Sequence, residues 1–247
     1  MSKTNYSYVG IALIILVFGI IFIPRIVDRI TSDDVTREES RSKNVGTQNN
    51  DETKLAFLNI NGEPKKVPDF SFIDQKGNTI TNNDYSGKVY LVEFFFTTCP
   101  TICPIMNSNL VKIQKNFDGI ENFGVASFTI NPMNDTPEVL KTYADKYGIT
   151  NPNWHLMTGD QDVIYELANQ GFSLYTAEDK NIEGGFEHSG NFALIDKNGF
   201  IRSRLDGYGN PMIFYNGIIS EEQQYNDEGM KEEISLLKED IAKLLKE

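Results

Sequence analysis

The chain has 247 residues, which is enough for one domain of ordinary size together with terminal extensions. A formal net charge of −12 argues against nucleic acid as a partner, because phosphate repels an acidic surface. Two cysteines are too few for a framework of structural disulfides, so we expect them to have a chemical role.

The amino terminus contains a segment long enough to cross a membrane. Residues 8–24 carry no charge and are bounded by Lys3 and Arg25. A transmembrane helix needs roughly 17–25 apolar residues, so this segment meets the lower limit. We interpret it as an uncleaved anchor, because neither a small-residue cleavage site nor a cysteine that could carry a lipid follows it. Residues 1–7 are then a short cytoplasmic tail.

The charges beside this segment leave its orientation open. Arg25 and Arg29 follow it and only Lys3 precedes it, which by the positive-inside rule favours a cytoplasmic domain. A large domain can be exported despite such charges, and the thiol chemistry described below favours the outer side. We therefore expect a single-pass protein of the cell inner membrane with its carboxyl-terminal domain in the periplasm. Residues 25–53, which are polar and charged, are expected to form a flexible linker.

The predicted domain begins at residue 54 with short strands. Residues 54–60, followed by Asn61-Gly62, indicate an edge strand and a tight turn. Residues 70–74 and 79–81 flank a Gln-Lys-Gly-Asn turn, which is typical of a hairpin. Residues 89–96 are nearly all apolar, with aromatic and β-branched side chains. This run predicts a buried central strand.

Helices and strands alternate after the central strand. Apolar side chains recur at helical spacing over residues 105–117, and residues 123–130 predict another buried strand. Thr136 is suited to the N-cap and Pro137 to the first position of a helix that stops at Gly148. The remaining predicted elements are a strand at residues 154–157, a helix at 161–170, and a hairpin formed by strands at 191–196 and 200–205. This order predicts an α/β fold whose sheet has mixed strand directions.

The last predicted element is an acidic amphipathic helix over residues 221–247. The segment holds nine acidic and four basic residues. Its apolar residues recur at helical spacing, at Met230, Ile234, Leu237, Ile241 and Leu244. We expect a solvated helix that docks by one face, rather than a helix that binds a partner. The main domain is then predicted to cover residues 54–220.

The two cysteines, Cys99 and Cys103, lie where the central strand turns into the next helix. Because they are four residues apart, we expect them on the same side of the first helical turn, where the sulfur atoms can meet. The positive end of the helix dipole favours thiolate over thiol, and Pro100 is suited to the first helical position. Such a pair is a redox pair or part of a metal site. A structural disulfide or two buried thiols are the alternatives.

The chain has two histidines, of which one is placed to join the cysteines. His188 lies in a glycine-rich loop at 183–190, just before a predicted strand, where a side chain can reach the end of a neighbouring strand. An ordinary loop histidine is the alternative interpretation. His155 is interpreted as structural. Met106 and Met133 could serve as weak ligands, but methionines at helical spacing are usually core residues.

Two thiolates and one imidazole form a three-ligand set of Cys99, Cys103 and His188. Soft sulfur ligands favour Cu(I) and are also used for Zn²⁺. Structural zinc prefers four closed ligands, and blue copper prefers two histidines and one cysteine, so an exchangeable three-coordinate copper site fits best. Copper binding needs reduced cysteines, so a disulfide between Cys99 and Cys103 would empty the site. The redox state of the pair would then be coupled to copper loading.

These motifs resemble the Sco/SenC family of membrane-anchored copper proteins, which assemble the copper site of cytochrome c oxidase. The resemblance covers about residues 54–205. It rests on Phe-Phe-Thr-Thr-Cys-Pro-Thr-Ile-Cys-Pro at 95–104, Asn-Pro-Met-Asn-Asp-Thr-Pro at 131–137, Trp-His-Leu-Met-Thr-Gly at 154–159, and His188-Ser189 with Leu-Ile-Asp at 194–196.

The resemblance implies a thioredoxin-like fold, a mixed sheet flanked by helices, with a copper ion on Cys99, Cys103 and His188. Asn131 stands where the family typically has Asp, which removes a carboxylate and touches none of the implied ligands.

Residues and resemblance together predict a membrane-tethered metallochaperone for the dinuclear copper site of cytochrome c oxidase. Its expected partners are the copper-bearing oxidase subunit and a thioredoxin-like reductant. The main alternative is a thiol–disulfide oxidoreductase that reduces a partner's cysteines with Cys99 and Cys103 and has no need of His188. A thiol peroxidase and a structural domain with an inert disulfide are two weaker possibilities. We expect a chaperone rather than an enzyme.

Overall fold

The computed structural model describes residues 54–60, 62–179, 181–182, 184–206 and 208–247, together with Leu16 and Phe18. The chain divides into two compact units, Met1–Asp51 and Glu52–Glu247. Among the residues described, no helix has both the length and the apolar character needed to cross a membrane. The predicted tail, anchor and linker at 1–7, 8–24 and 25–53 lie outside the described residues, apart from Leu16 and Phe18, and remain predictions.

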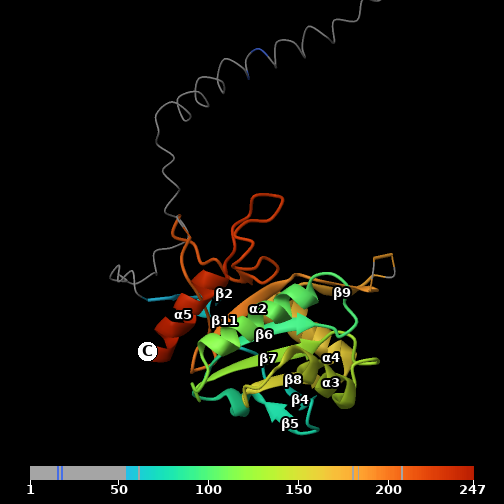
Figure 1. Ribbon diagram of the computed structural model, residues 1–247. Helices are drawn as coiled ribbons and strands as arrows, with labels where there is room; N and C mark the ends of the chain where they lie inside the picture. Colours follow the sequence, from blue (N-terminus) through green and yellow to red (C-terminus); the bar gives the residue numbers. More distant parts are fainter. Residues whose placement is uncertain are drawn as a thin grey trace, which may run out of the picture. The chain divides into compact units, whose positions relative to one another are not determined.

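A mixed sheet forms the centre of the second unit (Figure 1). Its strands are β1 (Ala56–Phe57), β4 (Ser71–Asp74), β5 (Thr79–Thr81), β6 (Val89–Phe95), β7 (Phe123–Thr129), β8 (Trp154–Thr158), β11 (Asn191–Ile195), β12 (Ile201–Ser203) and β13 (Tyr215–Asn216). They follow the order β1-β12-β11-β6-β7-β8-β4-β5, with β13 also paired to β11. β6, β7 and β8 are parallel, and the other neighbours are antiparallel. The sheet therefore confirms the predicted mixture of strand directions.

Helical segments alternate with the strands along the chain and cover the sheet. The helical segments are η1 (Asn82–Tyr85), α2 (Cys103–Asn116), α3 (Pro137–Tyr147), α4 (Gln161–Glu166), a π-helical turn η2 (Leu167–Phe172) and α5 (Ile234–Lys246). α2 connects β6 to β7 and α3 connects β7 to β8. Because crossovers between parallel strands are right-handed, these two helices lie on the same face of the sheet, where they contact each other. Two small strand pairs, β2 (Asn59–Ile60) with β3 (Glu63–Pro64) and β9 (Thr176–Glu178) with β10 (Phe186–His188), lie outside the sheet.

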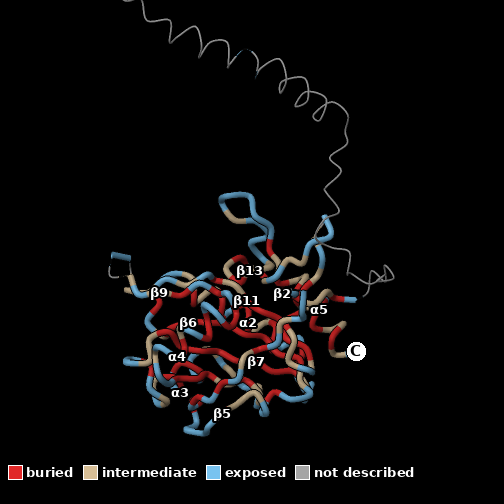
Figure 2. The backbone as a smooth tube through the Cα atoms, turned by 180° about the vertical axis from the view of Figure 1, so that it is seen from behind, coloured by how far each residue is buried: buried red, intermediate tan, exposed pale blue. Residues whose placement is uncertain are grey.

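Every residue of the central strand β6 is buried, as the red colour of its backbone shows (Figure 2). Phe95 of β6 packs against Tyr143 of α3, with 5.4 Å between ring centroids. Its neighbour Phe94 points to the opposite face, where it stacks on Phe128 of β7 and meets Phe172 of η2 edge to face. The apolar run in the sequence thus marks a strand that is buried on both sides.

The ends of α3 are those that the sequence predicts. Thr136 is the N-cap, and its Oγ1 accepts a hydrogen bond from the backbone N–H of Val139 at 3.4 Å. Pro137 is the first helical residue, where its missing N–H leaves no bond unmade. Gly148 ends the helix at φ 72, a left-handed conformation that glycine adopts without strain.

The carboxyl-terminal helix is shorter than predicted, because α5 begins at residue 234 and not at residue 221. A turn centred on Asn226 occupies the preceding segment. Its Oδ1 accepts hydrogen bonds from the N–H groups of Glu228 and Met230, and Gly229 has a φ of 78. A side chain that satisfies the backbone locally competes with a helix, so the helical spacing of Met230 was misleading.

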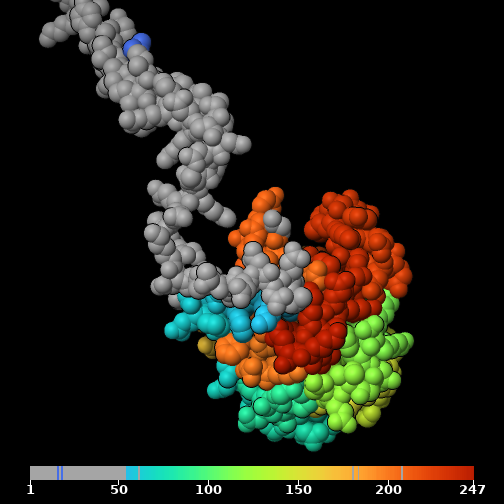
Figure 3. Space-filling model, turned by 90° about the vertical axis from the view of Figure 1, so that its left-hand side faces the viewer, coloured from blue at the N-terminus to red at the C-terminus, as the bar shows by residue number. Residues whose placement is uncertain are grey.

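α5 docks by its apolar face, as predicted, and by a buried ionic network. Its buried residues include Ile234, Leu237, Ile241 and Leu244. Asp240 is also buried and accepts hydrogen bonds from Arg204 Nε and from the Tyr215 hydroxyl, both at 2.7 Å. In Figure 3 the red carboxyl-terminal segment lies against the cyan segment near residue 55. Arg202 accounts for this placement, because its guanidinium donates to Leu55 O and to the Glu247 carboxylate.

The carboxyl group of Glu93 lies inside the core. Glu93 of β6 is fully buried, and its Oε1 accepts a hydrogen bond from Ser127 Oγ at 2.6 Å. Ser127 Oγ in turn accepts one from Trp154 Nε1 at 2.9 Å. Glu93 Oε2 has no hydrogen-bond partner among the described residues. Burial, opposed by the bond from Ser127, raises the pKa of Glu93 to about 7.

We expect Glu93→Gln to change how stability depends on pH. The unfolded chain releases this proton near pH 4.5 and the folded chain near pH 7. The folded pKa is the higher one, so the wild type loses about 3 kcal/mol of unfolding free energy through this group as pH rises across that window. Relative to wild type, the variant should therefore gain about 3 kcal/mol between pH 4.5 and about pH 8. Urea unfolding of both reduced proteins measures the difference, and a difference that does not vary with pH would contradict the assignment.

Candidate metal centre

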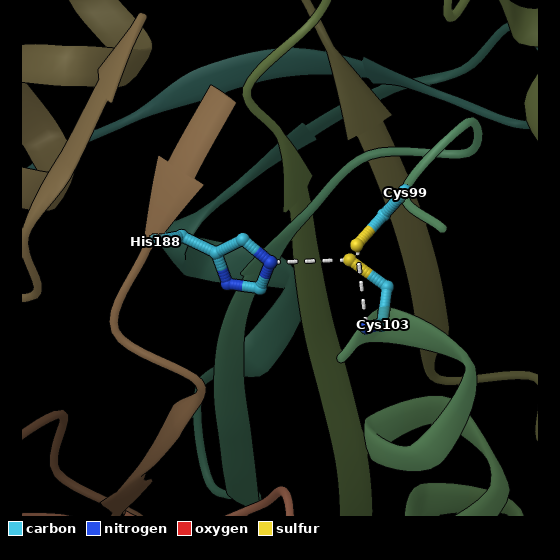
Figure 4. Close-up of side chains that lie close together, drawn as sticks. All are labelled: Cys99, Cys103 and His188. Carbon is cyan, nitrogen blue, oxygen red and sulfur yellow. Dashed lines mark hydrogen bonds between the residues drawn. The ribbon is translucent and has the colours of Figure 1, made fainter. Parts of the chain in front are cut away.

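The three predicted ligand residues, Cys99, Cys103 and His188, lie together beyond the carboxyl end of β6 (Figure 4). Their donor atoms, two sulfurs and one ring nitrogen, are all within 4.8 Å of one another. Cys103 Sγ is 3.1 Å from His188 Nε2. Both cysteines are buried and free, and His188 is half-buried. The structure thus brings together side chains that are 85 residues apart in the sequence.

Each cysteine is held by a different piece of backbone. Cys103 is the first residue of α2, and its N–H donates to Cys99 Sγ at 3.4 Å. Cys99 lies in the turn before the helix, where its own N–H donates to Phe96 O at 3.2 Å. The prediction that both cysteines share the first helical turn, with Pro100 as the first helical residue, is therefore wrong. Pro104 occupies the early helical position, and the turn folds back to place Cys99 against the helix N-terminus.

His188 reaches the cysteines from a hairpin and not from a loop. It is the last residue of β10 and pairs with Thr176 of β9. Its ring meets that of Phe96 edge to face, with 6.0 Å between centroids. The sequence predicted neither strand, because strands of three residues are too short to show a recognisable alternation of apolar and polar side chains. The pairing of β10 with β9 fixes the backbone of His188, which carries the imidazole, more firmly than a glycine-rich loop would.

Glycine lets this hairpin approach the cysteine turn closely. Gly184 has a φ of 91, and a Cβ built on it would lie 3.0 Å from Pro100 Cδ and 3.2 Å from the Phe96 ring. Any other residue there would be strained in its backbone and would press on the segment between the two cysteines. The hairpin turn therefore packs directly against the segment that carries the sulfur atoms.

The two thiols differ in acidity. A hydrogen bond from the Cys103 side chain lowers the pKa of Cys99 well below its ordinary range, against the effect of burial. The backbone N–H groups of Cys103 and Thr101 act in the same direction. Burial, followed by the Cys99 sulfur, raises the pKa of Cys103. Because the two thiols lie close together they titrate as a pair, which loses its first proton more readily than an isolated thiol does and its second less readily.

We expect an alkylating reagent to distinguish the two cysteines. In the reduced, metal-free protein at pH 5, iodoacetamide should label Cys99 at least about tenfold faster than Cys103, because the thiolate is the nucleophile. Cys99 is also the more accessible residue, with 8% of its surface exposed against 0% for Cys103. Peptide mass mapping measures the ratio, with the urea-unfolded chain as the control in which the bias disappears. Equal labelling of both cysteines in the folded chain would contradict the asymmetry.

The second histidine and the methionines have other surroundings. His155 Nδ1 is 3.0 Å from Asp74 Oδ2, and its ring meets that of Tyr85 edge to face, in line with its interpretation as structural. Met106 is fully buried in the core, as its helical spacing predicts. Met133 is 86% exposed in the segment between β7 and α3 and is not a core residue.

The donor set fits a soft ion of low coordination number. Thiolate sulfur and imidazole nitrogen are ligands that Cu(I) prefers. Among the described residues, no further cysteine, histidine or acidic side chain joins the group, whereas a closed zinc site needs four ligands. The proximity of the two sulfurs also allows them to form a disulfide, so one site supports both metal binding and thiol chemistry.

A pocket near the site belongs to α3. It has a volume of about 340 Å³ and is lined by Thr97, Glu138, Val139, Thr142, Tyr143 and Lys146. Neither cysteine nor His188 is among its lining residues. This pocket is therefore separate from the three predicted ligand residues.

Comparison with known proteins agrees with the site and the fold. Residues 59–220 match the model of the SCO1/SenC family. The chain is 33% identical over 159 residues to the SCO1 protein homolog of Bacillus subtilis, covering 63% of this chain and 80% of that protein. Several further relatives are matched over less than two thirds of their own length.

Two solved structures share the fold. One is a SCO1/SenC family lipoprotein from Bacillus anthracis str. Ames, 28% identical, with a TM-score of 0.60 over 73% of this chain and 95% of that one. The other is BsSco, 26% identical, with a TM-score of 0.58 over 73% of this chain and 94% of that one. BsSco is described as a member of the Sco family of cytochrome c oxidase assembly proteins that has a disulfide switch. The likeness confirms the thioredoxin-like mixed sheet flanked by helices, and this chain belongs to the SCO1/SenC family.

Proposed function

We propose that this protein binds Cu(I) through Cys99, Cys103 and His188 and delivers it to the dinuclear copper site of cytochrome c oxidase. The convergence of three soft donor atoms within 4.8 Å is the observation that carries the proposal. Membership of a family whose relative BsSco is described as an oxidase assembly protein supports the destination. A site with few ligands can pass its ion to a partner that offers more, whereas a closed cage retains it.

The residues divide the work of binding. The lowered pKa of Cys99 favours it as the first sulfur to bind the ion, while Cys103, whose pKa is raised, must release its proton. Copper affinity should therefore rise with pH. His188 supplies a neutral nitrogen from the β10 hairpin, a separate element from the one that holds the sulfurs. When the pair is oxidised to a disulfide, both sulfur ligands are lost, which couples copper loading to redox state.

The membrane location is part of the same proposal. Residues 8–24 have the apolar length of a spanning helix, and residues 25–53 would tether the domain at 54–220 on the outer side. A cysteine pair that cycles through a disulfide suits an oxidising compartment, where a thioredoxin-like reductant would keep it reduced. Protease added to cells with a permeabilised outer membrane should degrade the domain. Full protection of the domain would contradict this placement.

Transfer to the oxidase subunit tests the function. The purified full chain, loaded with Cu(I) under anaerobic conditions, is mixed with the copper-free, reduced domain of the subunit that carries the dinuclear centre. We expect copper to leave this protein and appear on the acceptor after the two are separated. Retention of copper on this protein, with the acceptor competent to take free Cu(I), would contradict delivery.

A thiol–disulfide oxidoreductase is the second candidate, and the unequal thiols favour it. A cysteine with a lowered pKa, Cys99, beside a more deeply buried cysteine with a raised pKa, Cys103, is the arrangement of an attacking and a resolving cysteine. The disulfide switch described for BsSco points in the same direction. An experiment with the oxidase-subunit domain whose cysteines are joined in a disulfide separates the two functions. Reduction of that disulfide with no copper transfer to the reduced form would favour the oxidoreductase.

A further inference from the structure

We infer that Asp135 is a positioning residue, which holds Cys99 in place for metal binding and for disulfide formation. The copper part of this inference rests on the proposed function, and the disulfide part does not. Asp135 lies in the segment between β7 and α3, neither of which carries a proposed ligand. It is nevertheless fully buried and bonded to the chain that leads to Cys99.

Asp135 accepts four hydrogen bonds, two on each carboxylate oxygen. Its Oδ2 accepts from the backbone N–H of Thr97 at 3.0 Å and from Thr129 Oγ1 at 2.5 Å. Its Oδ1 accepts from Thr97 Oγ1 at 2.5 Å and from Asn134 Nδ2 at 2.8 Å. A buried carboxylate is stable only when donors surround it, and here every acceptor direction is used. The Asp135 side chain is therefore held in place by four donors.

The bonds to Thr97 connect this carboxylate to Cys99. Thr97 lies just past the end of β6, at the start of the turn in which the Cys99 N–H bonds to Phe96 O. Asp135 holds both the backbone and the side chain of Thr97, so it fixes the direction in which the chain leaves the strand. Thr129, the last residue of β7, anchors the same carboxylate to the neighbouring strand.

Cys99 depends on this arrangement more than the other two ligand residues do. Cys103 is fixed by its place at the start of α2, and His188 by the pairing of β10 with β9. Cys99 belongs to no helix or strand, so the turn after Thr97 and the hydrogen bond from the Cys103 N–H set the position of its sulfur. A shift of that turn would move the Cys99 sulfur relative to the other two donor atoms. Both metal binding and disulfide formation are sensitive to such a shift.

A turn in the local sequence directs the Asp135 side chain toward Thr97. The carbonyl oxygen of Asn131 accepts hydrogen bonds from the N–H groups of Asn134 and Asp135, at 3.1 and 2.9 Å. This turn brings the carboxylate back toward the ends of β6 and β7. Thr136 then caps α3, so the same short segment ends one strand, positions the carboxylate and begins a helix.

Asp135→Asn tests the inference because it keeps the shape of the side chain. The amide nitrogen would face donors from Thr97 or Thr129, and one or more of the four bonds would be lost. We expect Cu(I) affinity, measured by competition with a chromophoric chelator, to fall by about 10- to 100-fold. We also expect the equilibrium constant for forming the Cys99–Cys103 disulfide with glutathione to fall by about tenfold or more in metal-free protein.

Asp240→Asn is the matched control. Asp240 is a second fully buried carboxylate with several donors, but it lies on α5 and its partners include Arg204 and Tyr215. That variant should lose stability without a change in either measurement. Thr129→Val removes a single hydroxyl from the cluster and should show a smaller change of the same sign, even if Asp135→Asn fails to fold.

The two measurements separate the possible failures. If neither wild type nor variants bind copper, the proposed function fails, and the glutathione equilibrium still tests Asp135. The inference is overturned if Asp135→Asn folds and leaves the disulfide equilibrium unchanged, or if Asp240→Asn changes that equilibrium as much. It is likewise overturned if Asp135→Asn does not fold and Thr129→Val matches wild type.

Discussion

His188→Ala should lower the affinity for Cu(I) by more than about 100-fold, because it removes one of three ligands and not merely a group that orients a ligand. The same variant should keep most of its thiol–disulfide exchange, since that reaction needs only the sulfur atoms of Cys99 and Cys103. Chelator competition measures the first effect, and the rate of reduction of a small disulfide measures the second. The contrast between the two measurements, and not the loss of copper alone, identifies His188 as a metal ligand.

His155→Ala is the control for this experiment. His155 is bonded to Asp74, and its ring contacts Tyr85, so it belongs to a different cluster from the ligand set. We expect the control to bind Cu(I) as tightly as wild type. If His188→Ala also binds copper as tightly as wild type, the imidazole is not a ligand and the three-donor site is wrong.

Oxidation of the cysteine pair should abolish copper binding altogether. In a Cys99–Cys103 disulfide neither sulfur is a thiolate, and a single imidazole holds Cu(I) weakly. The two sulfurs are close enough for this reaction, since they belong to the set of three donor atoms that lie within 4.8 Å of one another. An anaerobic Cu(I) titration of the oxidised full chain should show no tight binding, and treatment with a thiol reductant followed by its removal should restore it.

Mass spectrometry of the oxidised sample provides the necessary check, because the loss of two hydrogen atoms per chain identifies an intramolecular disulfide. Tight binding of copper by a sample that is fully oxidised would show that the sulfurs are not required. The coupling between redox state and copper loading would then be absent.

Much of the fold could be predicted from local sequence. The apolar run at 89–96 identified β6 because only a strand buried on both faces needs such a run. Thr136, Pro137 and Gly148 set the ends of α3 through backbone groups within a few residues, so a pattern rule was sufficient. The ligand set could be named because the chain contains only two cysteines and two histidines, of which His188 alone precedes a central strand.

Other features depend on contacts between distant residues. The turn that holds Cys99 outside the helix is fixed through Thr97 by Asp135, which lies 38 residues away from Thr97. The β9–β10 hairpin is too short to show periodicity, and Gly184 matters only through its approach to Pro100. The start of α5 was misplaced because the Asn226 side chain satisfies backbone groups that a helix would otherwise use. Tertiary hydrogen bonds and close packing decide these details.

The most direct test of the central claim is an anaerobic titration of the reduced full chain with Cu(I), followed by X-ray absorption spectroscopy of the bound ion. Binding should saturate at a single equivalent, with two sulfur neighbours and one nitrogen neighbour around the copper, as Cys99, Cys103 and His188 require. A copper ion bound by sulfur alone, or the absence of saturable binding, would contradict the account.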